Sequence, residues 1–317
     1  MSLVSALTTA VLPVVAIVVV GFVLGRVRDV DVDPLSAVTI YVLAPALVFS
    51  SLASSSLGGA GLARIAAGVF AFTLGMVAIA ELVARATGTG EPIRGALVLT
   101  STFPNAGNYG IPLSAFAFGA VGRSTAVVFL AFQAILMYTV GVYVASRGQA
   151  GSTAGAVREV FRLPLVYAVA VALLARWLGV VPPVDGTVMR TITLTGDAAI
   201  PIMLLLLGIQ LARTNYGAAL AEVGTATVLK LVVAPLVALG LVTVLGFADV
   251  TVARVFVLEC ATPAAVTPLI LTIEFAGDRS TGPSAPEFVG AAVMVTTALS
   301  VPVLTVLVAV LQSGIVL

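Results

Sequence analysis

FPNAGNYGIP, residues 103–112, lies in the middle of an apolar segment long enough to cross a bilayer. Each of its two prolines removes a backbone donor and crowds the preceding turn, and each of its two glycines adds backbone freedom. The stretch therefore predicts a break in the helix. Because non-helical backbone at membrane depth is tolerated only where protein buries it or water reaches it, we expect this break to line a cavity.

The rest of the chain has the composition of a membrane protein. Of its 317 residues, 60% are hydrophobic and 9% are charged, and the mean hydropathy is +1.20. A soluble domain carries roughly 25% charged residues. The long apolar runs favour helices over a β-barrel, whose strands would alternate polar and apolar residues. The predicted fold class is an all-α polytopic membrane protein.

Composition also excludes several kinds of function. A net charge of +1 gives no reason to expect a nucleic-acid partner, and the single cysteine, Cys260, excludes an internal disulfide and a thiolate metal cage. The chain has no histidine. An intramembrane enzyme would need a nucleophile with its base, or paired aspartates, and neither is evident. We therefore expect neither an enzyme nor a cofactor or metal.

Ten apolar runs have about the 20-residue length that a bilayer core requires. We place these spans at about 4–25, 34–53, 62–86, 93–118, 123–146, 161–180, 187–211, 218–246, 252–275 and 287–312. A polar stretch separates the fifth span from the sixth. The predicted domains are a five-helix repeat over 1–146, a cytoplasmic linker over 147–160 and a second five-helix repeat over 161–317.

Arginines in the loops set the expected orientation in the cell membrane. Nine follow odd-numbered spans and five lie on the other side, so positive charge favours a cytoplasmic linker with both termini outside. The two sets are Arg26, Arg28, Arg85, Arg94, Arg147, Arg158, Arg162, Arg213 and Arg279, and Arg64, Arg123, Arg176, Arg190 and Arg254.

The two halves of the chain look like copies of each other. Pro45 and Pro112 are 67 residues apart, as are Pro201 and Pro268, and the first break then aligns with residues 261–268. With 16 prolines in the chain, chance pairing is the alternative. Because each copy has five spans, the second would enter the membrane from the opposite side. Interrupted helices in corresponding positions of an inverted repeat point to a transport site near the midplane.

A broken helix offers chemistry at its inner ends. The new N-terminus presents unpaired N–H groups and the positive end of the helix dipole, which suit a carboxylate or phosphate. We expect Asn105 or Asn108 to cap the second half of the fourth span and Thr267 to cap the second half of the ninth. If the breaks cross, these side chains and amides form an anion-binding pocket, and Gly107 and Gly110 allow close approach. The alternative is that the prolines only kink two packed helices.

Three ionisable residues lie inside spans, where each costs roughly 2.5–3.5 kcal/mol on insertion scales. Asp197 and Lys230 either form a buried ion pair or serve the pocket, with Lys230 attracting the anion and Asp197 compensating its charge when the pocket is empty. Glu259 is either a ligand for a coupling ion or proton, or a helix–helix hydrogen-bond partner.

Residues 104–112, PNAGNYGIP, resemble the P-N-x-G-x-x-G-x-P signature in the fourth span of the auxin efflux carrier family, which includes the plant PIN auxin exporters. The later motifs are similar too: Leu204–Gly208, Leu229–Leu231 with Pro235, and Ala261–Ala264. The resemblance implies the fold of bile-acid:sodium symporters. In it, spans 1, 2, 6 and 7 form a scaffold, spans 3–5 and 8–10 form a mobile core with crossed helices 4 and 9, and access alternates by an elevator-like motion. It also implies a homodimer, through scaffold helices, in some members.

The predicted function is transport of a small organic anion, a carboxylate, bound at the crossing of helices 4 and 9. Two alternatives stay open, a symporter of the bile-acid type coupled to Na⁺ or H⁺, and an anion channel. The predicted substrate-binding residues are Asn105, Gly107, Asn108, Gly110, Pro112, Thr262, Pro263, Thr267, Pro268 and Lys230. Asp197 and Glu259 are the predicted coupling or charge-compensating residues.

Overall fold

A computed structural model describes residues 7–55, 57–147, 164–213, 223–276 and 284–317. All regular secondary structure in these ranges is helical, and one isolated β-bridge is the sole extended pairing there. Within the same ranges, seven helices are long and apolar enough to cross a membrane, and Pro164–Leu178 is a shorter apolar helix. The predicted linker, apart from Arg147, lies outside the described residues.

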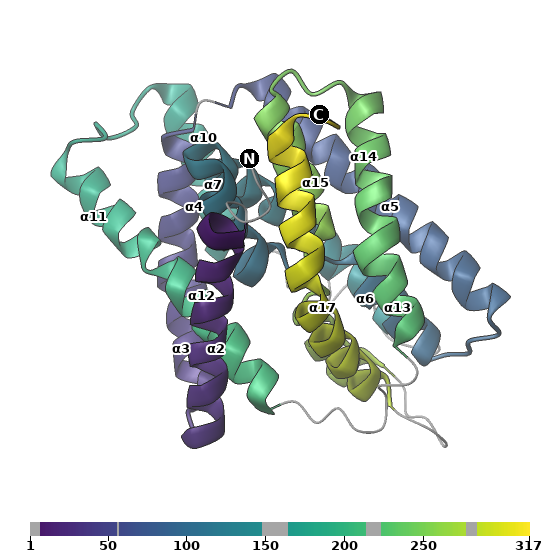
Figure 1. Ribbon diagram of the computed structural model, residues 1–317. Coiled ribbons are helices and arrows are strands. Elements are labelled where there is room, and N and C mark those ends of the chain that lie inside the picture. The colour runs from purple at the N-terminus through teal and green to yellow at the C-terminus, as the bar shows by residue number, and fades with distance from the viewer. Residues whose placement is uncertain (1–6, 56, 148–163, 214–222, 277–283) are drawn as a thin grey trace.

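A first helix group forms one side of the molecule, on the left in Figure 1. In it α2 packs along α12, and α4 packs against α10 and α11. Its members are η1 (Leu7–Val11), α2 (Leu12–Val27), α3 (Val32–Val38), η2 (Thr39–Leu43), α4 (Ala44–Ala53), α10 (Pro164–Leu178), α11 (Thr187–Asp197) and α12 (Ala199–Arg213).

A second helix group contains the remaining helices. In it α5 packs against α6, α7 and α14, while α15 packs against α7 and α14, and α17 against α6 and α16. Its members are α5 (Gly59–Ala86), α6 (Ile93–Thr102), η3 (Ala106–Gly110), α7 (Ile111–Leu136), η4 (Met137–Gly141), α8 (Val142–Ala145), α13 (Gly224–Val228), η5 (Leu229–Val233), α14 (Ala234–Leu245), α15 (Val250–Ala261), α16 (Thr267–Phe275) and α17 (Ala285–Ser313).

Prolines explain where most of the widened helical turns occur. Four of the five π-helical turns in the described residues, η1, η2, η3 and η5, end two residues before a proline, namely Pro13, Pro45, Pro112 and Pro235. A proline ring clashes with the carbonyl four residues earlier and cannot donate to it. A wider turn moves that carbonyl away while the helix continues.

A single glycine turns the chain inside α7. Gly119 has φ 61° and ψ −142°, a conformation that a side chain disfavours. Gly122 then lies so close to the Ser114 carbonyl that a Cβ at Gly122 would collide with it. Residues 111–118 and 120–136 therefore form two helices that fold back on each other, close to the predicted boundary between the fourth and fifth spans.

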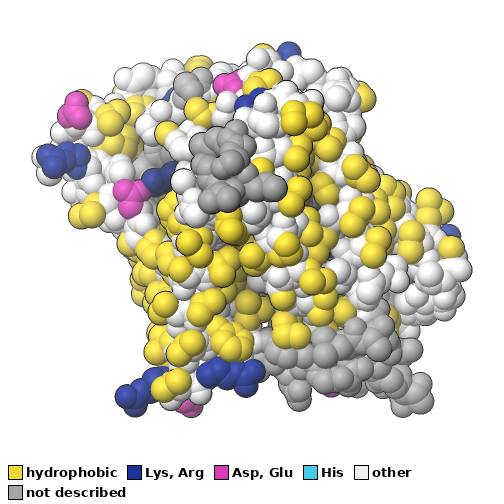
Figure 2. All heavy atoms as spheres, in the orientation of Figure 1, with side chains coloured by type: hydrophobic (Ala, Val, Ile, Leu, Met, Phe, Trp, Pro, Cys, Tyr) yellow, Lys and Arg dark blue, Asp and Glu magenta, His cyan; other side chains and the backbone are white. Residues whose placement is uncertain are grey.

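The surface agrees with a membrane environment. Figure 2 shows hydrophobic side chains over the middle of one face, with charged side chains gathered toward its two ends. Large apolar residues such as Leu82, Leu194 and Val244 are exposed, at 67%, 75% and 82%. Exposed apolar area on this scale would be costly in water, whereas lipid tails cover it without penalty. The chain is a multi-pass helical membrane protein; the count of ten spans and the inverted repeat stay predictions.

Candidate functional site

The first break lies where residues 103–112 predict it. Helix α6 ends at Thr102, and Phe103 is extended, with φ −98° and ψ 107°, because a residue that precedes a proline avoids the helical region. Asn105 then caps the next helical segment, and its Oδ1 accepts a hydrogen bond from the Asn108 amide at 3.2 Å. One of the two proposed capping residues, Asn105, is therefore the cap.

The second break follows the same rule. Helix α15 ends at Ala261, and Thr262 is extended at φ −60° and ψ 154° before Pro263. The helix resumes as α16 at Thr267, with Pro268 in its first turn. The prediction that Thr267 is the N-cap is wrong, because Val266 occupies that position and no side chain caps the helix.

The two breaks pair with each other through their backbones. The Asn105 amide donates to the Pro263 carbonyl at 2.8 Å, and the Ala265 amide donates to the Phe103 carbonyl at 2.9 Å. Between them, Pro104 and Ala264 form an antiparallel β-bridge. Two extended segments that lie about 160 residues apart in sequence thus satisfy each other's polar groups, as backbone buried away from water requires.

This pairing corrects one expectation. The amides of the breaks were expected to be free for an anion, yet those of Asn105 and Ala265 are bonded across the crossing, that of Asn108 is bonded to Asn105 Oδ1, and that of Ala264 donates to Thr296 Oγ1 at 3.1 Å. The first break also holds a side-chain donor that lacks a partner among the described residues. Asn105 is 5% exposed, and its Nδ2 has no hydrogen-bond partner among the described residues.

The predicted site residues differ in accessibility. Gly107, Asn108 and Thr267 are partly exposed, whereas Asn105 and the other predicted residues of the breaks are buried. The buried ones are Gly110, Pro112, Thr262, Pro263 and Pro268. Among the predicted residues of the breaks, solvent therefore reaches Gly107, Asn108 and Thr267 most readily.

Glu259 lies in the last turn of α15, in contact with the other broken helix. Its side chain is fully buried; Oε1 accepts a hydrogen bond from Ser114 Oγ at 2.6 Å, and Oε2 has no partner among the described residues. A Cβ at Gly110 would collide with this carboxylate, so the glycine makes room for it. No basic side chain in the described ranges forms a salt bridge with Glu259. A fully buried ionised carboxylate is costly without compensation.

Lys230 and Asp197 lie apart, which contradicts the idea that they pair or compensate each other. Lys230 is fully buried; its Nζ donates to the Cys260 carbonyl at 2.9 Å and lies 5.7 Å from the Phe72 ring centroid. The ammonium thus faces the carbonyl end of α15, where the helix dipole favours a cation. Asp197 is 51% exposed and pairs with Arg123.

Comparison with known proteins agrees with a transport role. The family described as membrane transport protein matches residues 6–308. The chain belongs to the membrane transport protein family. This is the auxin efflux carrier-like family that the PNAGNYGIP motif resembles. An uncharacterized transporter of Methanothermobacter thermautotrophicus is 26% identical over 272 residues, which cover 84% of this chain and 88% of that protein.

Within this membrane transport protein, two residues make contacts that the sequence did not predict. Gln133 is not among the predicted site residues, yet its Nε2 donates to the Pro104 carbonyl at 2.8 Å and so holds the first break. Arg123 was counted only as a loop charge, although it contacts Ser50, Ser51 and Asp197. The signal for Gln133 was an amide inside an apolar span, which needs a partner.

Proposed function

We propose that this membrane transporter carries a small organic anion and binds it at the crossing of the two breaks. The observation that carries the proposal is Asn105, whose buried Nδ2 donor has no partner among the described residues. Leaving a buried donor unsatisfied costs roughly 1–3 kcal/mol. A carboxylate that accepts this hydrogen bond recovers that cost, so the position suits an acceptor that comes and goes.

Neighbouring groups favour a negative ligand. The helical segment that begins at Ala106 and the helix that begins at Thr267 both start at the crossing, and their N-terminal ends carry partial positive charge. Asn108 and Thr267 are partly exposed there and add side-chain donors. Gly107 has only Leu130 side-chain atoms near its missing Cβ, at 3.6 and 3.7 Å, so a ligand can approach the backbone closely.

Access to this site would alternate by movement of the second helix group, which holds both breaks, against the first. The contact between α12 and η3 lies at that boundary. Coupling to a proton or Na⁺, as in a symporter of the bile-acid type, is favoured by one specific observation. The Glu259 carboxylate is buried, and its Oε2 has no partner within the part of the chain that the structure describes. We propose Glu259 as the group that carries the coupling ion.

Uptake by purified protein in liposomes tests the binding site. Asn105→Ala removes both the cap and the amide donor, whereas Asn105→Ser keeps a capping oxygen and removes only the amide. We expect uptake of a labelled carboxylate to fall at least tenfold in both variants. Loss of the cap costs typically about 1 kcal/mol, so Asn105→Ser should also retain more of the wild-type thermal stability than Asn105→Ala.

Gln312→Ala is the matched control, because it also removes a side-chain amide, but one whose Nε2 already donates to the Ala117 carbonyl at 2.8 Å. Its uptake should stay near the wild-type value. If Asn105→Ser restores uptake as well as stability, Asn105 is only a helix cap, and the proposed site fails.

A further inference from the structure

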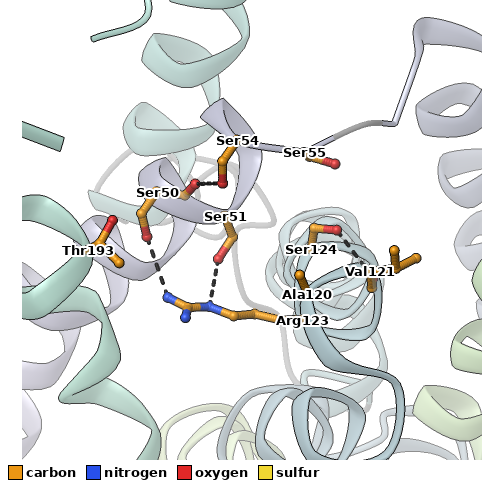
Figure 3. Close-up of a pocket in the computed structure, with 9 residues that line it drawn as sticks. All are labelled: Ser50, Ser51, Ser54, Ser55, Ala120, Val121, Arg123, Ser124 and Thr193. Atoms are coloured by element: carbon orange, nitrogen blue, oxygen red, sulfur yellow. Dashed lines mark hydrogen bonds between the residues drawn. The ribbon is translucent and has the colours of Figure 1, made fainter. Parts of the chain in front are cut away.

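A polar cavity lies at one end of the molecule, away from the crossing. Its volume is about 190 Å³, several times the roughly 30 Å³ that a water molecule occupies. Six hydroxyl side chains line it, as Figure 3 shows: Ser50, Ser51, Ser54, Ser55, Ser124 and Thr193. The one charged residue in the lining is Arg123. The helix of residues 106–118 separates this cavity from the crossing by about 18 Å, at 1.5 Å per residue.

Arg123 reaches into the cavity from α7 and is held by residues of the first helix group. Its Nε donates to Ser51 Oγ at 3.0 Å and its Nη2 to Ser50 Oγ at 3.5 Å, both on α4 (Figure 3). Its Nη1 pairs with Asp197 at the end of α11. The cavity therefore lies between the two helix groups, and Arg123 bridges them.

The chemistry of this lining suits an oxyanion. A guanidinium presents a planar fork of donors that matches a carboxylate or phosphate. The helix that restarts after Gly119 begins at the cavity with Ala120 and Val121, so its positive end adds to the field. Arg176 partly offsets the negative carbonyl end of α4, because it donates to the Leu52 carbonyl at 3.2 Å and to the Leu57 carbonyl, in the segment after α4, at 2.6 Å.

Asp197 is a replaceable partner for Arg123. The Arg123 side chain is 19% exposed, whereas that of Asp197 is 51% exposed. Ion pairs that water reaches are weak, since solvent screens them and the side chains lose freedom. Of the six lining hydroxyls, those of Ser50, Ser54 and Ser124 donate to backbone carbonyls. A dissolved anion that fits the cavity and accepts a hydrogen bond from one of the other three can compete with a single half-exposed carboxylate.

We propose that this cavity is a second anion-binding site, in which a small oxyanion, a carboxylate or a phosphate, replaces Asp197 on Arg123. The site lies outside the proposed transport site. An ion bound there contacts both helix groups and favours the arrangement in which they meet around Arg123.

Calorimetric titration of the purified full-length protein tests this site with succinate and, separately, inorganic phosphate. The Asn105→Ser background removes the proposed transport site, so one saturable event should remain in it. Adding Arg123→Gln should weaken that event at least tenfold. Adding Asp197→Asn should strengthen it several-fold, because the competing carboxylate is gone. Tighter binding of succinate identifies a carboxylate site, and tighter binding of phosphate a phosphate site.

The opposite signs of the two variants separate binding from structure. If Arg123 and Asp197 only hold the helices together, both substitutions weaken binding or both leave it unchanged. Either result would refute the proposed second site. Arg190→Gln, an exposed arginine on α11, is the control and should change nothing. Should Arg123→Gln not fold, tightening in Asp197→Asn alone decides the question. The two proposals are refuted by different measurements. Liposome uptake tests whether the crossing is the transport site, whereas this titration measures binding and no transport.

Discussion

At the scale of single residues, Glu259 carries the clearest consequence. A glutamine in its place would mimic a protonated carboxyl in shape and keep an oxygen for the Ser114 hydroxyl, which donates to Oε1 at 2.6 Å in the native protein. We therefore expect Glu259→Gln to fold with a melting temperature close to wild type. Its uptake should continue but lose any stimulation by an imposed proton or sodium gradient, because the charge that binds the ion is gone. Paired uptake assays with and without each gradient measure this.

Glu287→Gln is the control for Glu259→Gln. Glu287 lies in the first turn of α17 in a capping box with Ser284, and a glutamine serves there too. Its gradient response should match the wild type. Undiminished gradient stimulation in Glu259→Gln would assign the coupling ion to another group.

Sequence alone predicted some of these residues well and others poorly, for a physical reason. Asn105 was predictable as a cap because a cap depends on the residues just after it. The actual partners of Lys230 and Asp197 were not predictable, because each residue contacts a group distant in sequence. Lys230 contacts the Cys260 carbonyl, and Asp197 contacts Arg123. Long polar side chains choose partners by the packing of helices, which local pattern does not encode.

At the scale of helices, glycine sets how closely α2 and α12 approach. A Cβ at Gly208 would lie 2.6 Å from the Phe22 backbone nitrogen and would collide with the Val18 carbonyl. Small residues permit such backbone contact between membrane helices. We expect Gly208→Ala to separate the pair and lower the free energy of unfolding by about 1–3 kcal/mol, the usual cost of overpacking. A thermal melt of the purified protein measures the loss.

Gly240→Ala is a matched control on α14, since nothing lies within 4 Å of a Cβ there. Alanine is the better helix former by up to about 1 kcal/mol, so this variant should melt at the wild-type temperature or above. Equal melting temperatures for the two alanine variants would contradict a close helix contact at Gly208.

The interruptions of the helices were predictable because prolines act locally. Phe103 and Thr262 are extended since each precedes a proline, and both breaks fall where the prolines indicated. The backbone pairing of Pro104 with Ala264 was beyond reach, because it needs a partner segment from the other half of the chain. The same pairing occupies two of the amides that were expected to be unpaired, those of Asn105 and Ala265.

At the scale of the whole molecule, the helices divide by contact into the first helix group, which runs from η1 to α4 and from α10 to α12, and the second helix group. The resemblance to auxin efflux carriers implies the same division into scaffold and mobile core. Hydrophobic periodicity could not reveal it, because apolar residues face both lipid and protein. The motion of one group against the other, and the inverted repeat, stay predictions.

Orientation in the membrane yields the last prediction. The start of α2 and the end of α17 lie toward the same end of the molecule in Figure 1, and the end of α2, near Arg26 and Arg28, lies at the other. Positive charge favours the cytoplasm, so we expect Ser313 outside and Arg28 inside the cell. A membrane-impermeant thiol reagent should label Ser313→Cys on intact cells and Arg28→Cys only after permeabilisation. Cys260 is buried and should stay unlabelled in the parent protein, which provides the background. Labelling in the reverse order would invert the orientation and place the Arg123 cavity on the cytoplasmic side.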